Sequence, residues 1–443
     1  MRKAIAAVAG IALLAGVAAA ADFDGSYIVP LDHEAIQYAK TPVSDRVSAL
    51  QQRVRDGKTK LTFEGRQGYL RSVLNALDVP VSSQILVFSK TSFQAPLISP
   101  RMARALYYTD DVSVGWVPGG DLLEIAALDP KLGVVFYTID QERTERPRID
   151  RRDDCLQCHA SGGTAGVPGL MVRSIYPERT GMPLFHAGGF VTDHRSPLAE
   201  RWGGWYVTGT HGQQRHMGNV FVEDRDHPDK LDKDKGANVT DLSSRIDTAQ
   251  YLSPHSDIVA LMVLEHQTRM TNLLTRVGYE TRMALHYQKT LNQAMGEPED
   301  HMGESTTRRI DNAAEALLKY MLFTDEALLD GQVKGTSAFA AEFSARGPRD
   351  RRGRSLRDLD LTRRMFRYPC SFLIYSPSFT ALPAAVRDRI YRRLWEVLTG
   401  ADQTPTYARL TPADRRAIHE ILLETHRGLP EYWRPAQASA TNR

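Results

Sequence analysis

Five consecutive residues near the middle of the chain constrain its fold more than any other feature. Cys155 and Cys158 are separated by two residues, and His159 follows directly. The chain has only three cysteines, and the third, Cys370, has no obvious partner. Two thiols and an imidazole this close together are typical of a bound prosthetic group, a metal site or a redox pair. The surrounding segment therefore has to be organised around these side chains.

Three roles for the cysteine pair are disfavoured by the sequence around it. A thioredoxin-like redox pair belongs in a βαβ unit, which the flanking residues 151–154 and 160–163 do not supply. A zinc site needs a second pair of ligands at matched spacing, and the chain has no second cysteine pair. A disulfide between Cys155 and Cys158 would close too short a loop to stabilise the fold much.

Covalent attachment of haem is the remaining interpretation. Two thiols at this spacing reach the two vinyl groups at one edge of a porphyrin, and the next residue then places its imidazole beneath the iron. The sequence therefore predicts a single haem c that is bound through Cys155 and Cys158, with His159 as the proximal iron ligand.

A second stretch, Gly-Val-Pro-Gly-Leu at residues 166–170, follows this motif. It resembles the small soluble c-type cytochromes, in which a Gly-Pro-x-Leu stretch comes after the haem motif. In that family the proline carbonyl accepts a hydrogen bond from the proximal histidine and fixes its tautomer. The resemblance implies this role for Pro168 towards His159, although a Pro-Gly pair is also a common turn.

Much of residues 60–400 is similar to a family of large single-haem bacterial cytochromes of undefined biochemical role. The resemblance is carried by four stretches: DHRSPL at 193–198, RWGGWYV at 201–207, RHMGN at 215–219 and YPCS at 368–371. It implies haem binding and electron transfer, and it assigns no substrate.

The first 21 residues have the pattern of an export signal. Arg2 and Lys3 precede an apolar run over 4–17, and small residues at 18–21 offer a cleavage site before Asp22. The alternative is an uncleaved anchor, but the Ala-rich run is only marginally long enough to span a bilayer. Haem c is attached outside the cytoplasm, so we expect a periplasmic protein that is soluble after cleavage. With Arg2 and Lys3 removed, the net charge of +3 falls near zero, and nothing points to nucleic acid.

The hydrophobic pattern predicts an α+β fold in three parts. Residues 22–150 form a mixed α/β unit, residues 151–222 an irregular segment that wraps the haem, and residues 250–435 a mainly helical region. In the first part, Leu122–Leu128 and Gly133–Ile139 flank a turn and predict a hairpin. Helices are expected from Thr41-Pro42 to Gly57 and, in the last part, at 257–295, 308–330, 357–366, 383–399 and 411–427.

The sixth iron ligand decides what such a haem can do, and the sequence leaves it open. A thioether or a second imidazole makes an electron carrier, whereas an open site permits chemistry on small molecules. The main candidates are His216, Met217 and His266, and an open site is the alternative. Further histidines and methionines within reach of the haem segment are Met182, His186, His194 and His211.

Three functional hypotheses follow. The first is a periplasmic carrier that passes single electrons between redox partner proteins. The second is a haem-dependent oxidoreductase of peroxidase type, in which Glu265, His266 and Arg269 form a distal acid–base group. The third is a sensor or partner-binding protein in which the haem has a structural role (a haem-stapled sensor). The first is favoured, because the motif most often marks a carrier.

Other side chains have two open interpretations each. The aromatic residues Trp202, Trp205 and Tyr206 either pack on the porphyrin or belong to an ordinary core. The arginine-rich stretch 346–357 is either a docking patch for an acidic partner or a mobile surface loop. Cys370, in an apolar run, is most simply a buried small residue.

Overall fold

Strands and helices dominate different parts of the chain, and the predicted α+β class is confirmed. The computed structural model describes residues 27–434, so the export signal predicted at 1–21 lies outside the described residues. Among residues 27–434, every helix is too short or too polar to cross a lipid bilayer.

The first half is built on a seven-stranded sheet in the order β6-β5-β4-β3-β2-β1-β9. Each neighbouring pair in it is antiparallel. The predicted hairpin is present as β4 and β5, because Asp129 accepts hydrogen bonds from the backbone of Lys131 and Leu132 and so closes the turn. The strands are β1 Ile85–Val87, β2 Arg104–Tyr108, β3 Val112–Trp116, β4 Leu122–Asp129, β5 Gly133–Asp140, β6 Asp150–Arg151 and β9 Trp205–Tyr206.

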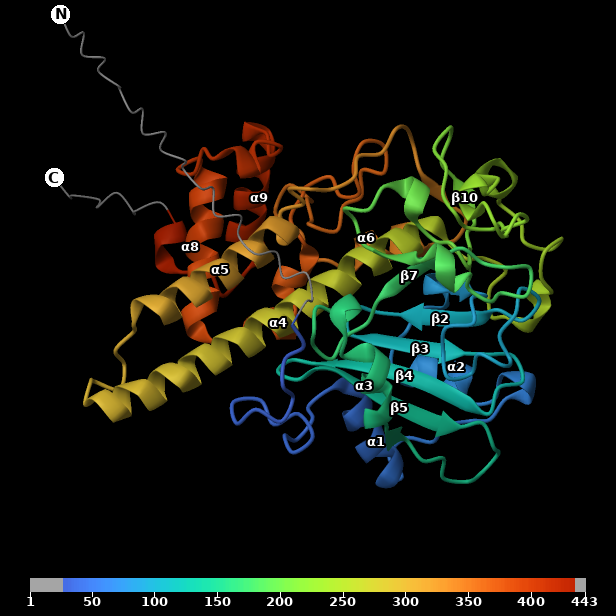
Figure 1. Cartoon of the computed structure of the whole chain (residues 1–443), viewed down its shortest axis with the longest axis horizontal. Coiled ribbons are helices and arrows are strands. Elements are labelled where there is room, and N and C mark those ends of the chain that lie inside the picture. The colour runs from blue at the N-terminus through green and yellow to red at the C-terminus, as the bar shows by residue number, and fades with distance from the viewer. Residues whose placement is uncertain (1–26, 435–443) are drawn as a thin grey trace, which may run out of the picture.

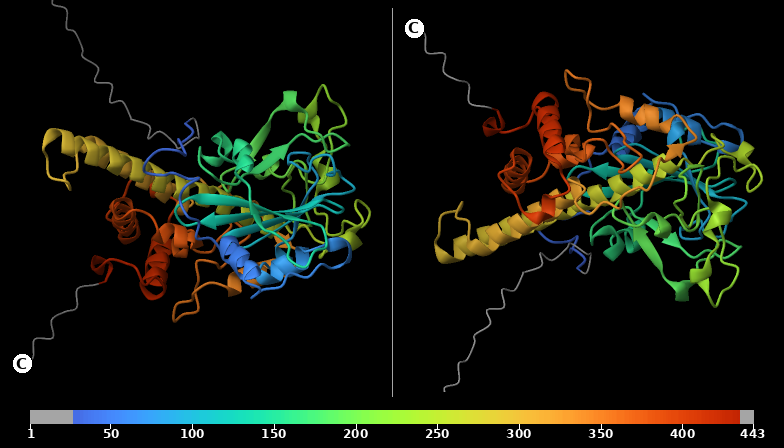
Figure 2. Two further views of the ribbon diagram at one scale, coloured as in Figure 1. Left: turned by 90° about the horizontal axis from the view of Figure 1, so that it is seen from below. Right: turned by 90° about the horizontal axis from the view of Figure 1, so that it is seen from above.

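The two faces of this sheet are covered differently. Helices α1 (Arg46–Arg55) and α2 (Leu70–Ala76) lie on one face, and α3 (Leu156–His159) lies on the other (Figures 1 and 2). The sequence predicts that the first helix begins at Thr41-Pro42, but α1 begins later, at Arg46. The Asp45 side chain accepts hydrogen bonds from the first free backbone N–H groups and so caps the helix there.

The predicted haem-wrapping segment is irregular but not separate from the sheet. Its Trp205–Tyr206 strand pairs with β1 and so extends the sheet of the N-terminal unit. It also carries a short hairpin of β7 (Val172–Ile175) and β8 (Gly189–Thr192). A further small ladder joins β10 (Gly209–Thr210) to β11 (Lys334–Gly335).

A 38-residue helix, α4 (Ile258–Met295), runs from the sheet into the helical half (Figure 1). The Asp257 side chain caps its first turn, and Gly296 ends it in the left-handed conformation. The other helices of this half are α5 Glu304–Met321, α6 Phe339–Ala345, α7 Pro377–Thr380, α8 Ala384–Thr399 and α9 Pro412–Thr425.

The prediction of a helix at 357–366 is wrong. The Asp360 side chain instead accepts from the backbone of Thr362 and Arg363, and Leu361 has a φ of 56°. A helix cannot continue through that backbone conformation. The helix predicted at 308–330 ends at Met321 because Phe323 likewise has a positive φ.

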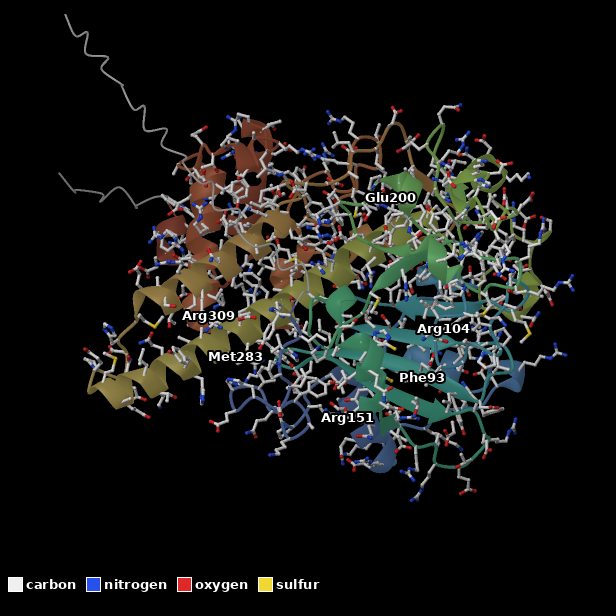
Figure 3. All side chains as sticks on the ribbon, in the orientation of Figure 1. Phe93, Arg104, Arg151, Glu200, Met283 and Arg309 are labelled. Atoms are coloured by element: carbon white, nitrogen blue, oxygen red, sulfur yellow. The ribbon has the colours of Figure 1, made fainter. Side chains whose placement is uncertain are left out.

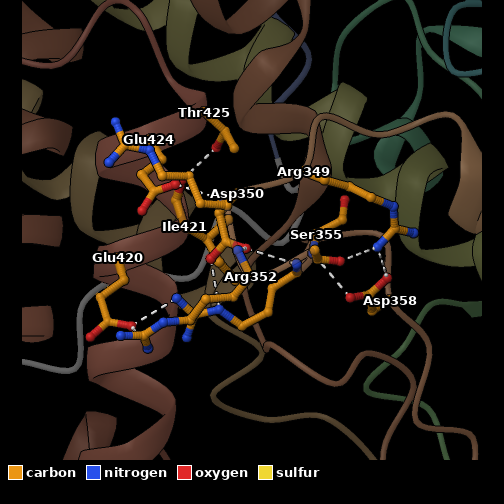
Figure 4. Close-up of polar contacts among 12 residues, drawn as sticks. Arg349, Asp350, Arg352, Ser355, Asp358, Glu420, Ile421, Glu424 and Thr425 are labelled. Atoms are coloured by element: carbon orange, nitrogen blue, oxygen red, sulfur yellow. Dashed lines mark hydrogen bonds and ion pairs between the residues drawn. The ribbon is translucent and has the colours of Figure 1, made fainter.

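The arginine-rich stretch forms ion pairs with other parts of the chain. Arg352 and Arg354 both pair with Glu420 on α9, at 2.9 and 2.7 Å (Figure 4). Arg349 pairs with Asp358 at 3.0 Å, and Arg357 pairs with Asp110. Much of the positive charge of this stretch is therefore neutralised within the chain.

Glu326, which follows α5, gives a testable pH dependence of stability. Burial raises its pKa to about 7, although the N–H of Met365 donates to its carboxyl group. The folded protein therefore binds one more proton than the unfolded chain between its ordinary pKa of 4.5 and pH 7. This contribution to stability is complete below pH 4.5 and is lost as the pH rises through 7.

We expect Glu326→Gln to unfold like the parent protein near pH 4.5 and to be more stable than it at pH 8. The difference should be roughly 2–3 kcal/mol at most, since the glutamine cannot ionise. Urea unfolding at several pH values measures it, and Glu304→Gln on the exposed face of α5 is the control. Parallel pH profiles of the parent protein and Glu326→Gln would contradict the assignment.

Candidate haem attachment site

The single turn of α3 brings the two cysteines and the histidine of the motif together. Cys155 directly precedes the helix and is partly buried, and Cys158 is exposed. Residues three apart on a helical turn lie on the same side of it. Both thiols are free, as is that of the fully buried Cys370. Two unpaired thiols at the surface are therefore presented from one short element.

The His159 ring is held in one orientation by the loop that follows it. Its Nδ1 lies 2.9 Å from the carbonyl oxygen of Gly169, and the backbone N–H of Gly169 donates to the carbonyl of His159 at 2.9 Å. A carbonyl oxygen can only accept, so Nδ1 carries the proton of the neutral ring. The lone pair is thereby left on Nε2, which is the atom an iron ion needs.

The carbonyl that accepts from His159 is one residue later than the resemblance implied for Pro168. The Pro168 carbonyl instead accepts from the backbone N–H of Val134 on β5, at 3.1 Å. This contact requires Gly133, whose φ is 78° and whose position would bring a Cβ within 2.7 Å of the Pro168 oxygen. Pro168 therefore fastens the loop to the sheet.

A second fastening joins the same loop to α4. The side chain of Asn272 donates to the carbonyl of Leu170 at 2.7 Å and accepts from its N–H at 3.2 Å. Gly169 allows this approach, because a Cβ there would lie 2.2 Å from the Asn272 oxygen. The acceptor for His159 is thus held between the sheet and the long helix.

The sheet face beside α3 is apolar at the motif and charged farther along. Ala126, Val134 and Phe136 form a small buried cluster, and the partly buried residues packed against it are Leu128, Cys155, Leu156 and Leu170. The ring centroids of Phe136 and His159 are 4.8 Å apart. Across the small residue Gly115, Arg104 pairs with Glu124 at 2.7 Å, and Figure 3 shows Arg104 over the strands.

Burial is the main influence on the pKa values of His159 and Cys155. It lowers the pKa of His159, with a smaller lowering by Arg104, so the ring is neutral at pH 7. It also raises the pKa of Cys155 to about 11, with a further rise from the Asp154 carboxylate. A neutral thiol can add to a vinyl group, and a neutral imidazole can bind iron.

These residues fit a covalently bound haem better than a bare metal ion. In residues 27–434 no three His, Cys, Asp or Glu side chains are grouped to hold a metal ion. Haem iron does not need such a group, because the porphyrin supplies four nitrogen ligands and the protein adds only axial ones. His159 is oriented to supply one of these, and an apolar sheet face adjoins it.

Two of the candidate distal ligands, His216 and Met217, are buried among other side chains. His216 is buried against Trp202 and His211, and its Nδ1 accepts from the N–H of Gly218. Met217 lies in an apolar cluster with Leu184 and Val220. The His159 ring bonds to Gly169 and lies against Phe136. Within residues 27–434, these contacts include none of the candidate ligands, which are His216, Met217, His266, Met182, His186, His194 and His211.

Glu265, His266 and Arg269 share α4, and the contacts of Glu265 and of His266 are with different residues. Glu265 pairs with Arg201 at 3.0 Å and accepts from Thr192. The two nitrogens of His266 bond to His194 Nδ1 and to the Ser371 hydroxyl, each at 2.8 Å. Arg269 lines a cavity together with Leu170, Asp193 and Arg195.

The aromatic residues of the RWGGWYV stretch belong to the protein core. Trp202 and Trp205 are part of the large cluster of the helical half, and Tyr206 belongs to the cluster between the sheet and α1 and α2. The Trp205 indole donates to the carbonyl of Arg173, and the Tyr206 hydroxyl donates to that of Pro100. These contacts agree with the core interpretation.

Comparison with known proteins adds no assignment. No family model matches the chain, and neither a curated protein nor a solved structure matches it.

Several site residues could not be identified from the sequence. Gly169 acts through its backbone carbonyl, which no residue type reveals. Asn272 lies 102 residues from the leucine that it binds. Arg104 on β2 reaches Glu124 on β4 because Gly115, on the strand β3 between them, has no side chain in the way.

Proposed function

We propose that the protein is an exported c-type cytochrome that transfers single electrons. One haem would be bound through thioether links to Cys155 and Cys158, with His159 as an axial iron ligand. When bound, the haem supplies a metal that accepts and releases one electron. The N-terminal sequence pattern supports export to the periplasm.

The hydrogen bond between His159 Nδ1 and the Gly169 carbonyl is the observation that carries this proposal. It orients the imidazole and keeps the lone pair on Nε2, as proximal histidines of haem proteins require. A structural histidine beside a cysteine pair has no need of this arrangement. The motif and this orientation together favour haem over a redox-active cysteine pair.

The exposure of the site supports electron exchange with partner proteins. Cys158 is exposed at the surface, so the porphyrin edge attached there would also lie near the surface. Close approach of a partner's redox centre requires such an accessible edge. The sheet and α4 meanwhile hold the loop that orients the proposed iron ligand His159, which would keep rearrangement between redox states small.

Intact-mass and absorption measurements on protein exported through a haem-maturation pathway test the proposal. We expect the mass of the cleaved polypeptide plus one haem, and the visible spectrum of a haem c. Cys155→Ala/Cys158→Ala should lose both the added mass and the colour. Cys370→Ala is the matched control and should keep both, because Cys370 lies apart in the core of the helical half.

A colourless parent protein with the mass of bare polypeptide would overturn the proposal. Rapid reduction of the ferric haem by a small cytochrome distinguishes a carrier from a haem-stapled sensor, which would exchange electrons slowly.

A further inference from the structure

An ion pair lies on the sheet face that carries the haem attachment motif. The Phe136 ring on β5 lies against His159, and Phe136 is paired across the sheet with Ala126 on β4. Residues two apart on a strand point to the same face, so Glu124 occupies this face one row beyond Ala126. Glu124 pairs with Arg104 at 2.7 Å. The pair therefore adjoins the contact between His159 and the sheet.

The small residue Gly115 lets the Arg104 side chain lie across β3. A Cβ at Gly115 would collide with the Arg104 guanidinium, so a larger residue there would displace it. Among residues 27–434, the ion pair found for each of the two side chains is the one with the other. Removing either charge therefore leaves the other without its countercharge.

The pair is largely shielded from water. The Arg104 and Glu124 side chains are 21% and 19% exposed, whereas those of Arg152 and Asp154, beside the motif, are 40% and 41% exposed. Water and dissolved ions weaken the field of an exposed charge more than that of a shielded one. A charge of the Arg104–Glu124 pair therefore acts more strongly on its surroundings than one of the exposed pair.

The two charges reach the residues of the motif. Burial has the largest effect on the pKa of His159, and beyond the hydrogen bond to Gly169, Arg104 lowers this pKa and Glu124 raises it. After burial and the Asp154 carboxylate, Glu124 also raises the pKa of Cys155. The charges of the pair therefore act on His159 with opposite signs.

We propose that the Arg104–Glu124 pair tunes the reduction potential of the haem, because its two charges offset each other beside the iron ligand. This inference rests on the proposed function, since it concerns the haem bound at Cys155 and Cys158. Ferric iron carries one more positive charge than ferrous iron. A lone cation nearby would therefore favour the reduced haem and raise the potential, and a lone anion would favour the oxidised haem and lower it.

Potentiometric titration of the haem-loaded protein at pH 8 tests the proposal. Glu124→Gln leaves Arg104, which stays charged, without its countercharge. We expect its equilibrium constant for reduction to rise about threefold to tenfold, where tenfold corresponds to about 59 mV for one electron. Arg104→Gln should lower the potential by a similar amount. The double variant Arg104→Gln/Glu124→Gln should return close to the potential of the parent protein.

Two further variants separate the effect of charge from that of packing. Arg104→Lys keeps the charge and should stay near the potential of the parent protein. Arg148→Gln removes the same charge from an exposed pair with Asp150 at the edge of the sheet, and it should shift the potential much less. Loss of packing alone would not give opposite shifts in Glu124→Gln and Arg104→Gln, since both variants break the same ion pair.

The haem content, measured first by intact mass, separates this proposal from the proposed function. If the parent protein carries haem and both single variants leave the potential unchanged or shift it in the same direction, the tuning role is overturned and the cytochrome assignment stands. Loss of haem from Arg104→Gln alone would also overturn it and would assign the guanidinium to holding the haem. A parent protein without haem overturns both proposals.

Discussion

His159→Gly is expected to keep the covalently bound haem that we propose and to lose its axial imidazole. The two thiols remain in this variant, so the mass should still include one haem. The visible spectrum of imidazole-ligated iron should disappear, because the Nε2 lone pair that the Gly169 carbonyl orients is gone. Added imidazole should restore the spectrum, since the space of the side chain is then open.

The absorption spectrum before and after imidazole addition measures this effect. His227→Gly is the control, because His227 is exposed and its ring pairs with Asp224, which is also exposed. An unchanged spectrum in His159→Gly would mean that another residue holds the iron on this side.

Arg201→Met is expected to lower the free energy of unfolding by about 3–5 kcal/mol, as is typical when one partner of a buried ion pair is removed. Arg201 and Glu265 are both almost completely buried, and burial already raises the pKa of Glu265 to about 7 despite the attraction of Arg201. Without Arg201 the carboxyl group must stay buried without a countercharge or take up a proton. The carbonyls of His194 and Ser196 also lose their donor.

Urea unfolding at pH 7 measures this loss. Arg308→Met, in an exposed pair with Glu304, is the control and should change stability by less than about 1 kcal/mol. The double variant Arg201→Met/Glu265→Gln should be less destabilised than the sum of its single changes, because it removes both charges. Strict additivity would contradict a direct interaction.

The sequence predicted those elements whose signals are local. The β4–β5 hairpin follows from two apolar runs around an Asp-Pro turn, and α4 follows from apolar periodicity behind the Asp257 cap. The helix predicted at 357–366 is absent, because the Asp360 side chain accepts hydrogen bonds from the backbone N–H groups that follow it and so favours a turn. Helical periodicity alone does not detect that competition.

The candidate haem site likewise contains some residues that the sequence reveals and others that it does not. Cys155, Cys158 and His159 were singled out by their spacing, which suits the covalent chemistry that we propose for them, and one helical turn brings them together. The acceptor for His159 was placed one residue early, because a backbone carbonyl leaves no trace in the residue type. The cavity beside the loop was not predicted, since the residues that line it come from separate segments between Gly162 and Asn272.

Helix α4 sets a fixed spacing between the loop that orients His159 and the segment that carries Arg201. Asn272 holds the loop that orients His159, and Glu265, seven residues earlier on the same helix, holds the Arg201 segment beside the cavity. Seven residues of α-helix span about 10 Å and resist stretching. A displacement of α4 would therefore move the His159 loop and the Arg201 segment together.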